Sequence, residues 1–167
     1  MHSIVIMGVS GCGKSSLGEA VAHATGLPLV EGDHHHSPAN RDKMARGIAL
    51  TDADRADWLA TLADQLQARP GGAVVTCSAL KRAYRDRLRQ AAPGLRFVFL
   101  EIGKVDAQAR VSARASHFFS TSLVDNQFAT LESPVGEAGV LRLDATLPLA
   151  QLQTTVTAWL ATTQEPA

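Results

Sequence analysis

The sequence contains few cysteines and few aromatic residues, and its charges cancel. Two cysteines among 167 residues, Cys12 and Cys77, provide neither a disulfide framework nor the spacing of a metal site. Aromatic residues make up 5 % and form no pattern of stacking platforms, which argues against RNA binding. Lys and Arg number 16, as do Asp and Glu, so no global field attracts nucleic acid or an acidic membrane.

Long hydrophobic runs are missing as well. No apolar run approaches the roughly 18 residues of a membrane span, and the first one stops at Gly8, as a strand does, rather than continuing as a signal peptide. Hydrophobic residues still make up 46 %, enough for one sizeable core. We therefore expect a cytoplasmic protein with a single domain over residues 1–167 and no membrane or nucleic-acid partner.

Short apolar runs alternate with helical patterns along the chain. Five runs are typical of buried strands: residues 4–7, 27–30, 73–77, 97–102 and 140–143. Amphipathic or capped helical patterns cover residues 14–24, 52–69, 80–91 and the stretch after Pro148. This alternation predicts the α/β class, with a parallel sheet covered on both faces by right-handed crossovers.

The segment 104–137 departs from this alternation. It carries Arg110 and Arg114 at helical spacing, and a second helical pattern follows around residues 123–131. An arginine-rich excursion between two strands is typical of a lid over an anionic ligand. A solvated helical hairpin is the alternative interpretation.

Residues 8–16, GVSGCGKSS, fit the phosphate-binding Walker A pattern between a predicted strand and a predicted helix. The glycines let backbone N–H groups turn toward phosphate oxygens at the positive end of the helix. Lys14 would reach the β- and γ-phosphates, and the Ser15 hydroxyl would ligate Mg²⁺. The predicted nucleotide site is the whole loop: Gly8, Val9, Ser10, Gly11, Cys12, Gly13, Lys14, Ser15 and Ser16.

The rest of the sequence favours a small-molecule kinase among the proteins with such a loop. A GTPase would need an Asn-Lys-x-Asp segment to read the base, and none is present. A large motor ATPase would need a strand that ends in an acidic residue, whereas the third predicted strand runs into Thr76, Cys77 and Ser78. Phosphoryl transfer to a small molecule therefore agrees best with the length and the arginine-rich segment.

Asp33 is the best candidate for the base that such a kinase needs near the acceptor hydroxyl. It follows the second predicted strand, at the sheet edge where open α/β folds bind ligands. A cap of the next helix is the alternative role for Asp33. Lys81, Arg85 and Arg89 share one helix face at i, i+4 spacing, which suits a carboxylate substrate or, alternatively, a solvated basic face.

Three consecutive histidines, residues 34–36, follow Asp33 directly. Neighbouring side chains of an extended chain point to opposite faces, so all three cannot reach one ion from a strand. Because no further His or Cys lies nearby at ligand spacing, the sequence argues against a zinc site.

Four motifs occur in order along residues 4–144: GVSGCGKSS, GDHHHSPANRDKMARGIALTDADRADWL, CSALKRAYRDRLR and HFFSTSLVDNQFATLESP. Together they resemble the gluconate kinases, small P-loop kinases related to the shikimate and nucleoside-monophosphate kinases. The resemblance implies a three-layer α/β/α fold with strand order 2-3-1-4-5, a helical lid and a homodimer. It also implies ATP- and Mg²⁺-dependent transfer of the γ-phosphoryl group to the 6-hydroxyl of D-gluconate.

The resemblance also implies roles for individual residues. Lys14 and the lid arginines Arg110 and Arg114 would offset charge on the phosphates. Asp33 would be the base or hydroxyl orienter, and His36 would face the sugar acid. The implied contacts to the carboxylate or hydroxyls of the acceptor are Lys81, Arg85 and Arg55.

Three residues depart from the family pattern on the substrate side. His34 and His35 replace larger apolar or aromatic residues, and Ala49 replaces a proline. Two alternatives to a gluconate kinase therefore stay open. One is a kinase of another small hydroxy acid such as shikimate, and the other is a nucleotide-binding domain without catalysis.

Overall fold

The computed structural model describes residues 2–114 and 121–162. Residues 117–119, the histidine and two phenylalanines of the predicted lid motif, lie outside the described residues.

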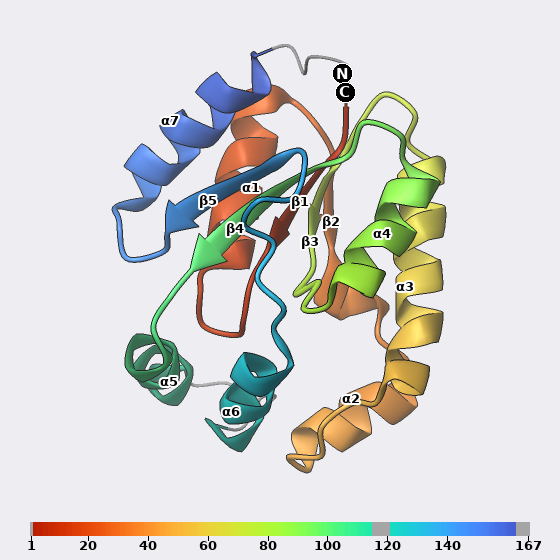
Figure 1. Ribbon diagram of the computed structural model, residues 1–167, viewed down its shortest axis with the longest axis vertical. Helices are drawn as coiled ribbons and strands as arrows, with labels where there is room; N and C mark the ends of the chain where they lie inside the picture. Colours follow the sequence, from red (N-terminus) through yellow and green to blue (C-terminus); the bar gives the residue numbers. More distant parts are fainter. Residues whose placement is uncertain (1, 115–120, 163–167) are drawn as a thin grey trace.

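A five-stranded parallel sheet forms the centre of the structure (Figure 1). Its strands are β1 (Ile4–Met7), β2 (Leu29–Glu31), β3 (Val74–Thr76), β4 (Arg96–Glu101) and β5 (Val140–Asp144). They lie in the order β2-β3-β1-β4-β5, which confirms the predicted fold and order. All five strands were predicted, with bounds that differ by at most two residues.

Helices cover both faces of the sheet because successive strand residues point to opposite sides. Ile4 and Ile6 share one core with α1 (Lys14–Thr25) and α7 (Leu149–Leu160). The alternate residues of β1, Val5 and Met7, belong to a second core, which is formed with α3 (Asp52–Gln67) and α4 (Arg82–Ala91). The result is the three-layer arrangement that the resemblance implies.

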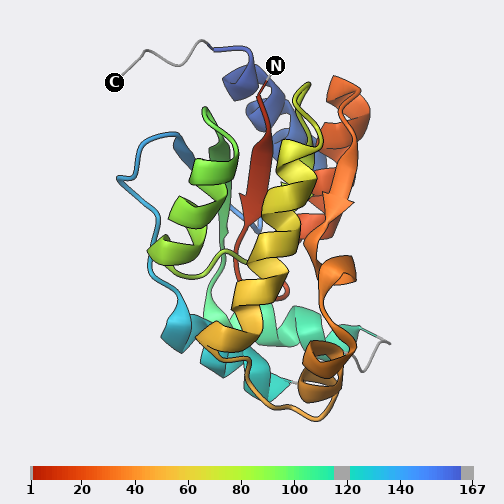
Figure 2. The same cartoon turned by 90° about the vertical axis from the view of Figure 1, so that its right-hand side faces the viewer.

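The remaining helices lie beyond the carboxyl ends of the strands (Figures 1 and 2). They are the 3₁₀ helix η1 (Gly32–His35), α2 (Pro38–Ala45), α5 (Lys104–Ala113) and α6 (Thr121–Thr130). The last two form the predicted excursion over 104–137, and they pack against each other. The phosphate loop between β1 and α1 therefore opens toward these helices, at the edge where such sheets bind ligands.

Local sequence explains where the helices near this edge begin. The Ser37 hydroxyl accepts a hydrogen bond from the Asn40 N–H at the start of α2, with Pro38 in the first helical position. Thr51 and Asp54 form a reciprocal capping box at the start of α3. The short polar helix α2 was not predicted, and α4 begins two residues later than predicted because Lys81 is still extended.

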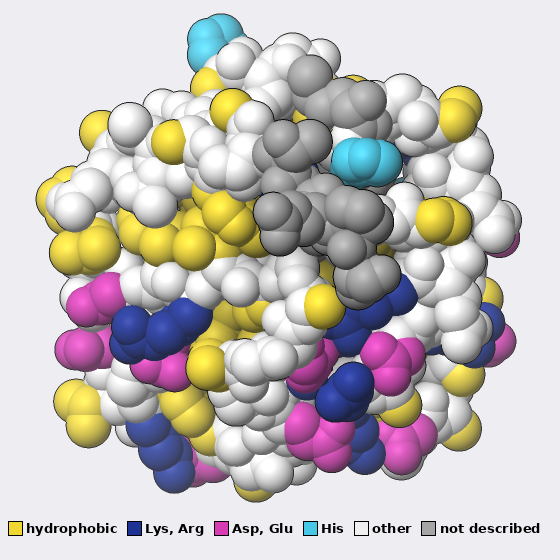
Figure 3. Space-filling model, turned by 45° about the horizontal axis from the view of Figure 1, so that its top comes forward, with side chains coloured by type: hydrophobic (Ala, Val, Ile, Leu, Met, Phe, Trp, Pro, Cys, Tyr) yellow, Lys and Arg dark blue, Asp and Glu magenta, His cyan; other side chains and the backbone are white. Residues whose placement is uncertain are grey.

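The surface carries acidic and basic side chains next to one another. On the face shown in Figure 3 they intermingle rather than separate by sign. The pair Arg142–Glu101, with 2.6 Å between Nη2 and Oε1, is one example. None of the helices in the described part of the chain has the length and hydropathy to span a membrane.

Candidate active site

The loop of residues 8–16 has the backbone conformation that its glycines allow. Gly8, Gly11 and Gly13 all have positive φ angles, of 146°, 85° and 96°. A side chain on Gly11 would place its Cβ 2.7 Å from the Ala107 carbonyl oxygen on α5. The loop therefore packs tightly against the excursion, and a substituted Gly11 would push the two apart.

Two side chains of this loop make contacts that bear on phosphate and metal binding. Lys14 Nζ donates hydrogen bonds to the carbonyls of Gly8 and Val9, at 3.0 and 3.1 Å. The Ser15 hydroxyl donates to Glu31 Oε2 at 3.1 Å, and Thr76 donates to the same oxygen at 2.7 Å. The acidic partner of Ser15 thus comes from the end of β2 and not from β3, where a carboxylate was sought in the sequence.

Asp33 lies two residues past the end of β2, in η1, and is exposed. The preceding Gly32 permits this placement, because a Cβ there would lie 2.1 Å from the carbonyl oxygen of Thr76. Asp33 does not cap the next helix, since Ser37 fills that position. The structure thus places Asp33 at the wall of a pocket that also contains Lys14.

His36 is the one buried member of the histidine run, and it lies in the same pocket. Its ring stacks on Trp58, with 4.3 Å between ring centroids, and Asn40 Nδ2 lies 3.4 Å from its Nδ1. Burial lowers the pKa of His36 to about 4, against the smaller opposing effect of Asp33. The ring is therefore neutral near pH 7, and one ring nitrogen can donate a hydrogen bond to a ligand.

Arg55 supplies a second cation to this pocket, beside Lys14. It is 7 % exposed, and its Nη1 donates to the Leu50 carbonyl at 3.0 Å. No carboxylate within residues 2–114 and 121–162 forms an ion pair with it. Five structural segments and Ser78 line this pocket. The segments are the loop (Ser10, Lys14), η1 with the residue after it (Asp33, His36), α2 with its following turn (Met44, Ile48, Ala49, Leu50), α3 (Arg55, Trp58) and α6 (Leu123, Asn126, Gln127).

The two lid arginines have different surroundings. Arg110 Nη1 donates to the carbonyls of Gly11 and Cys12, at 3.2 and 3.4 Å, and Nη2 donates to Ala145 at 3.1 Å. Arg110 therefore lies beside the phosphate loop. Arg114 follows α5 and is exposed.

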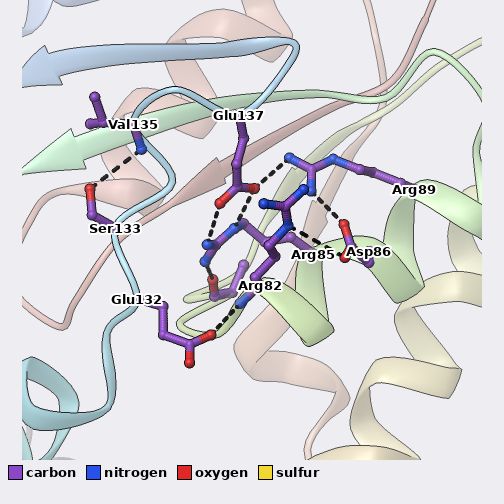
Figure 4. A network of polar contacts seen from close by, with 9 residues as sticks. Arg82, Arg85, Asp86, Arg89, Glu132, Ser133, Val135 and Glu137 are labelled. Atoms are coloured by element: carbon purple, nitrogen blue, oxygen red, sulfur yellow. Dashed lines mark hydrogen bonds and ion pairs between the residues drawn. The ribbon is translucent and has the colours of Figure 1, made fainter.

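The structure places Lys81 and Arg85 outside the pocket. Lys81 forms an ion pair with Asp52 at 2.9 Å. Arg85 is fully buried and donates through Nε and Nη2 to both carboxylate oxygens of Glu137, at 3.0 and 2.6 Å (Figure 4). Arg89 also donates to Glu137, so the predicted cationic face holds a carboxylate from the protein itself.

The Arg85–Glu137 pair has two further consequences. Burial would raise the pKa of Glu137, but the hydrogen bonds from Arg85 and Arg89 outweigh it and hold that pKa below its ordinary value. Arg85 Nη1 also donates to the carbonyl of Ala79, the one non-glycine residue with positive φ among those described. The pair therefore supports the strained turn directly after Ser78, which lines the pocket.

Known proteins are similar to this chain in sequence and in fold. A family model of the AAA domain matches residues 4–134. The gluconokinase of Gluconobacter oxydans is 45% identical over 84% of this chain and 80% of its own length. The thermoresistant gluconokinase of Escherichia coli is 42% identical over 89% and 87%. The chain belongs to the gluconokinase family.

A solved structure supports this gluconokinase-family assignment. The crystal structure of a gluconokinase from Sinorhizobium meliloti superposes with a TM-score of 0.88 at 50% identity, covering 96% of this chain and 91% of that one. The histidine run, residues 34–36, belongs to no cluster of potential metal ligands within residues 2–114 and 121–162. Among the described residues no group of three or more His, Cys, Asp or Glu side chains could hold an ion.

Proposed function

We propose that the protein is a gluconokinase that transfers the γ-phosphoryl group of ATP to the 6-hydroxyl of D-gluconate. One observation carries this proposal: the pocket joins the phosphate loop, through Ser10 and Lys14, to a carboxylate, a neutral histidine and an arginine that has no ion pair within the described residues. A sugar acid presents the matching groups, which are hydroxyls and one carboxylate.

The candidate residues in and around the pocket would each have a part in this reaction. Arg55 binds the gluconate carboxylate by a charge-assisted hydrogen bond, and His36 donates to a hydroxyl. Asp33 accepts the proton of the attacking hydroxyl as the new P–O bond forms and the bond from the γ-phosphorus to ADP breaks. Lys14 and Arg110 offset the charge on the phosphates, and Arg114 joins them when the lid closes. Lys81 and Arg85 act from outside the pocket by positioning its walls.

Ser15 and Glu31 fit a Mg²⁺ ion. Both offer hard oxygen donors, and their side-chain oxygens lie 3.1 Å apart beside the phosphate loop. Magnesium keeps several waters and binds through one or two carboxylates together with substrate phosphates. Ser15 and Glu31 would hold the ion, which would supply positive charge to offset that of the phosphates. We also propose that the protein acts in the cytoplasm as a homodimer, with twice the 17.7 kDa mass of one chain.

A coupled assay of ADP release across sugar acids tests this function. We expect acceptor-dependent turnover with gluconate, which should disappear without Mg²⁺, and little with shikimate. Turnover with shikimate and none with gluconate would replace the acceptor. Tight ATP binding without acceptor-dependent ADP release would support a nucleotide-binding domain without catalysis.

A further inference from the structure

Gln127, on the lid helix α6, contacts the phosphate loop directly. Its side-chain Oε1 accepts a hydrogen bond from the backbone N–H of Ser10, and the N···O distance is 2.6 Å. The two residues are 117 positions apart in the sequence, so this bond joins the lid to the loop.

The partner of Gln127 is a group that such loops use for phosphate. A Walker A loop binds anionic oxygens through backbone N–H groups that point inward. An amide oxygen carries partial negative charge and accepts the same hydrogen bond. Gln127 is the partner of this donor among the described residues.

The position of Ser10 indicates which phosphate this donor serves. Ser10 and Gln127 both line the pocket that contains Asp33 and His36, where the acceptor binds under the proposed function. The phosphate that meets the acceptor is the γ-phosphoryl group. The Ser10 N–H therefore lies at the γ-phosphoryl end of the loop.

The helix that carries Gln127, α6, is joined to α5 by polar contacts, so a movement of α6 can be passed on to α5. Asp125 on α6 pairs with Lys104 on α5 at 2.7 Å and accepts a hydrogen bond from Gln108 at 2.9 Å. The same α5 carries Arg110, whose guanidinium bonds to loop carbonyls. A displacement of α6 by the nucleotide would therefore act on a second contact between lid and loop.

We propose that Gln127 holds the place of a γ-phosphate oxygen on the Ser10 N–H and couples the lid to nucleotide binding. ATP then competes with the Gln127 amide for this donor and releases α6 from the loop when it binds. This inference rests on the proposed function and adds a residue to it.

Two variants with opposite expected effects test the proposal. Gln127→Ala removes the competing amide and should raise the affinity for an ATP analogue by about 2- to 10-fold, which corresponds to the net contribution of one hydrogen bond. Gln127→Glu keeps the shape but adds a negative charge beside the phosphates, so it should weaken binding by about 10-fold or more. The measurement is calorimetric titration with a non-hydrolysable ATP analogue and with ADP, in Mg²⁺ and without gluconate. The gain in Gln127→Ala should be larger for the analogue than for ADP.

Matched changes at Gln151, an exposed glutamine on α7, serve as controls and should leave both affinities unchanged. Unchanged or weaker analogue binding by folded Gln127→Ala would overturn the placeholder role, and weaker binding would make Gln127 a ligand of ATP. Absence of analogue binding in the unaltered protein would instead contradict the proposed function itself.

Discussion

Arg55 and Arg85 are both buried, yet they differ in what balances their charge. Arg85 is 0 % exposed and is bound by both carboxylate oxygens of Glu137. Arg55 is 7 % exposed, lines the pocket and bonds to one backbone carbonyl. A buried cation is costly without a partner. Arg55 lies over the Tyr84 ring, 5.8 Å from its centroid, but forms no ion pair among the described residues. Under the proposed function the acceptor carboxylate would pair with Arg55 as Glu137 pairs with Arg85.

The largest expected effect belongs to Asp33, the carboxylate on the pocket side of this comparison. Asp33→Asn should reduce turnover by a factor of about 10² to 10⁴, as expected for loss of a general base, while ATP binding is retained. Steady-state kinetics with calorimetric ATP titration measure both quantities. Asp64→Asn, at an exposed position of α3, is the control. Turnover near that of the unaltered protein would remove Asp33 from the catalytic step.

Arg85 should matter for stability more than for substrate binding. Arg85→Met leaves Glu137 buried without its main partner and should lower the free energy of unfolding by about 3–5 kcal/mol. Urea denaturation measures the loss. The double variant Arg85→Met with Glu137→Met should recover most of it, because no unpaired charge then stays buried. The exposed Arg87→Ala on the same helix is the matched control.

Arg55 should show the reverse pattern. Arg55→Met removes the charge-assisted bond to the gluconate carboxylate and should raise the KM for gluconate by about 10- to 100-fold. The KM for ATP should change little, since Arg55 lies on the acceptor side of the pocket. If Arg85→Met raised the gluconate KM as much as Arg55→Met does, the comparison between the two arginines would fail.

The smallest expected effect is the pH dependence that His36 contributes. Its pKa falls from 6.5 to about 4 on folding. The unfolded chain therefore binds more protons between these values, and the stabilising contribution present above pH 6.5 is lost as the pH falls toward 4. His36→Gln should flatten this part of the plot of melting temperature against pH. An unchanged slope would show that other groups govern it.

Much of the fold could be predicted from the sequence, because short apolar runs and glycine breaks are local signals. The strand Ile4–Met7 and the loop after it are read from adjacent residues. The helix Pro38–Ala45 was missed because it is short and polar. It is held by the Ser37 cap and by an ion pair between Lys43 and Asp54, 2.8 Å apart, on the following helix.

Part of the candidate site could also be predicted, namely the residues that lie within the sequence motifs. Asp33, His36 and Arg55 all reached the pocket. Glu31 was missed although it stands two residues before Asp33, because only the pairing of β2 beside β3 brings it to Ser15. Gln127 was noted only as part of a motif, without a role.

The sequence by itself determined the phosphate loop, the alternation of strands and helices, and the family, because each depends on residues close together in the chain. Only the tertiary structure decided which buried arginines have a carboxylate partner within the protein. Arg85 and Glu137 stand 52 positions apart, and nothing in either segment predicts their contact. A buried arginine is either one half of a structural ion pair or a group that can bind a ligand. Which of the two it becomes depends on whether the fold brings a carboxylate to it.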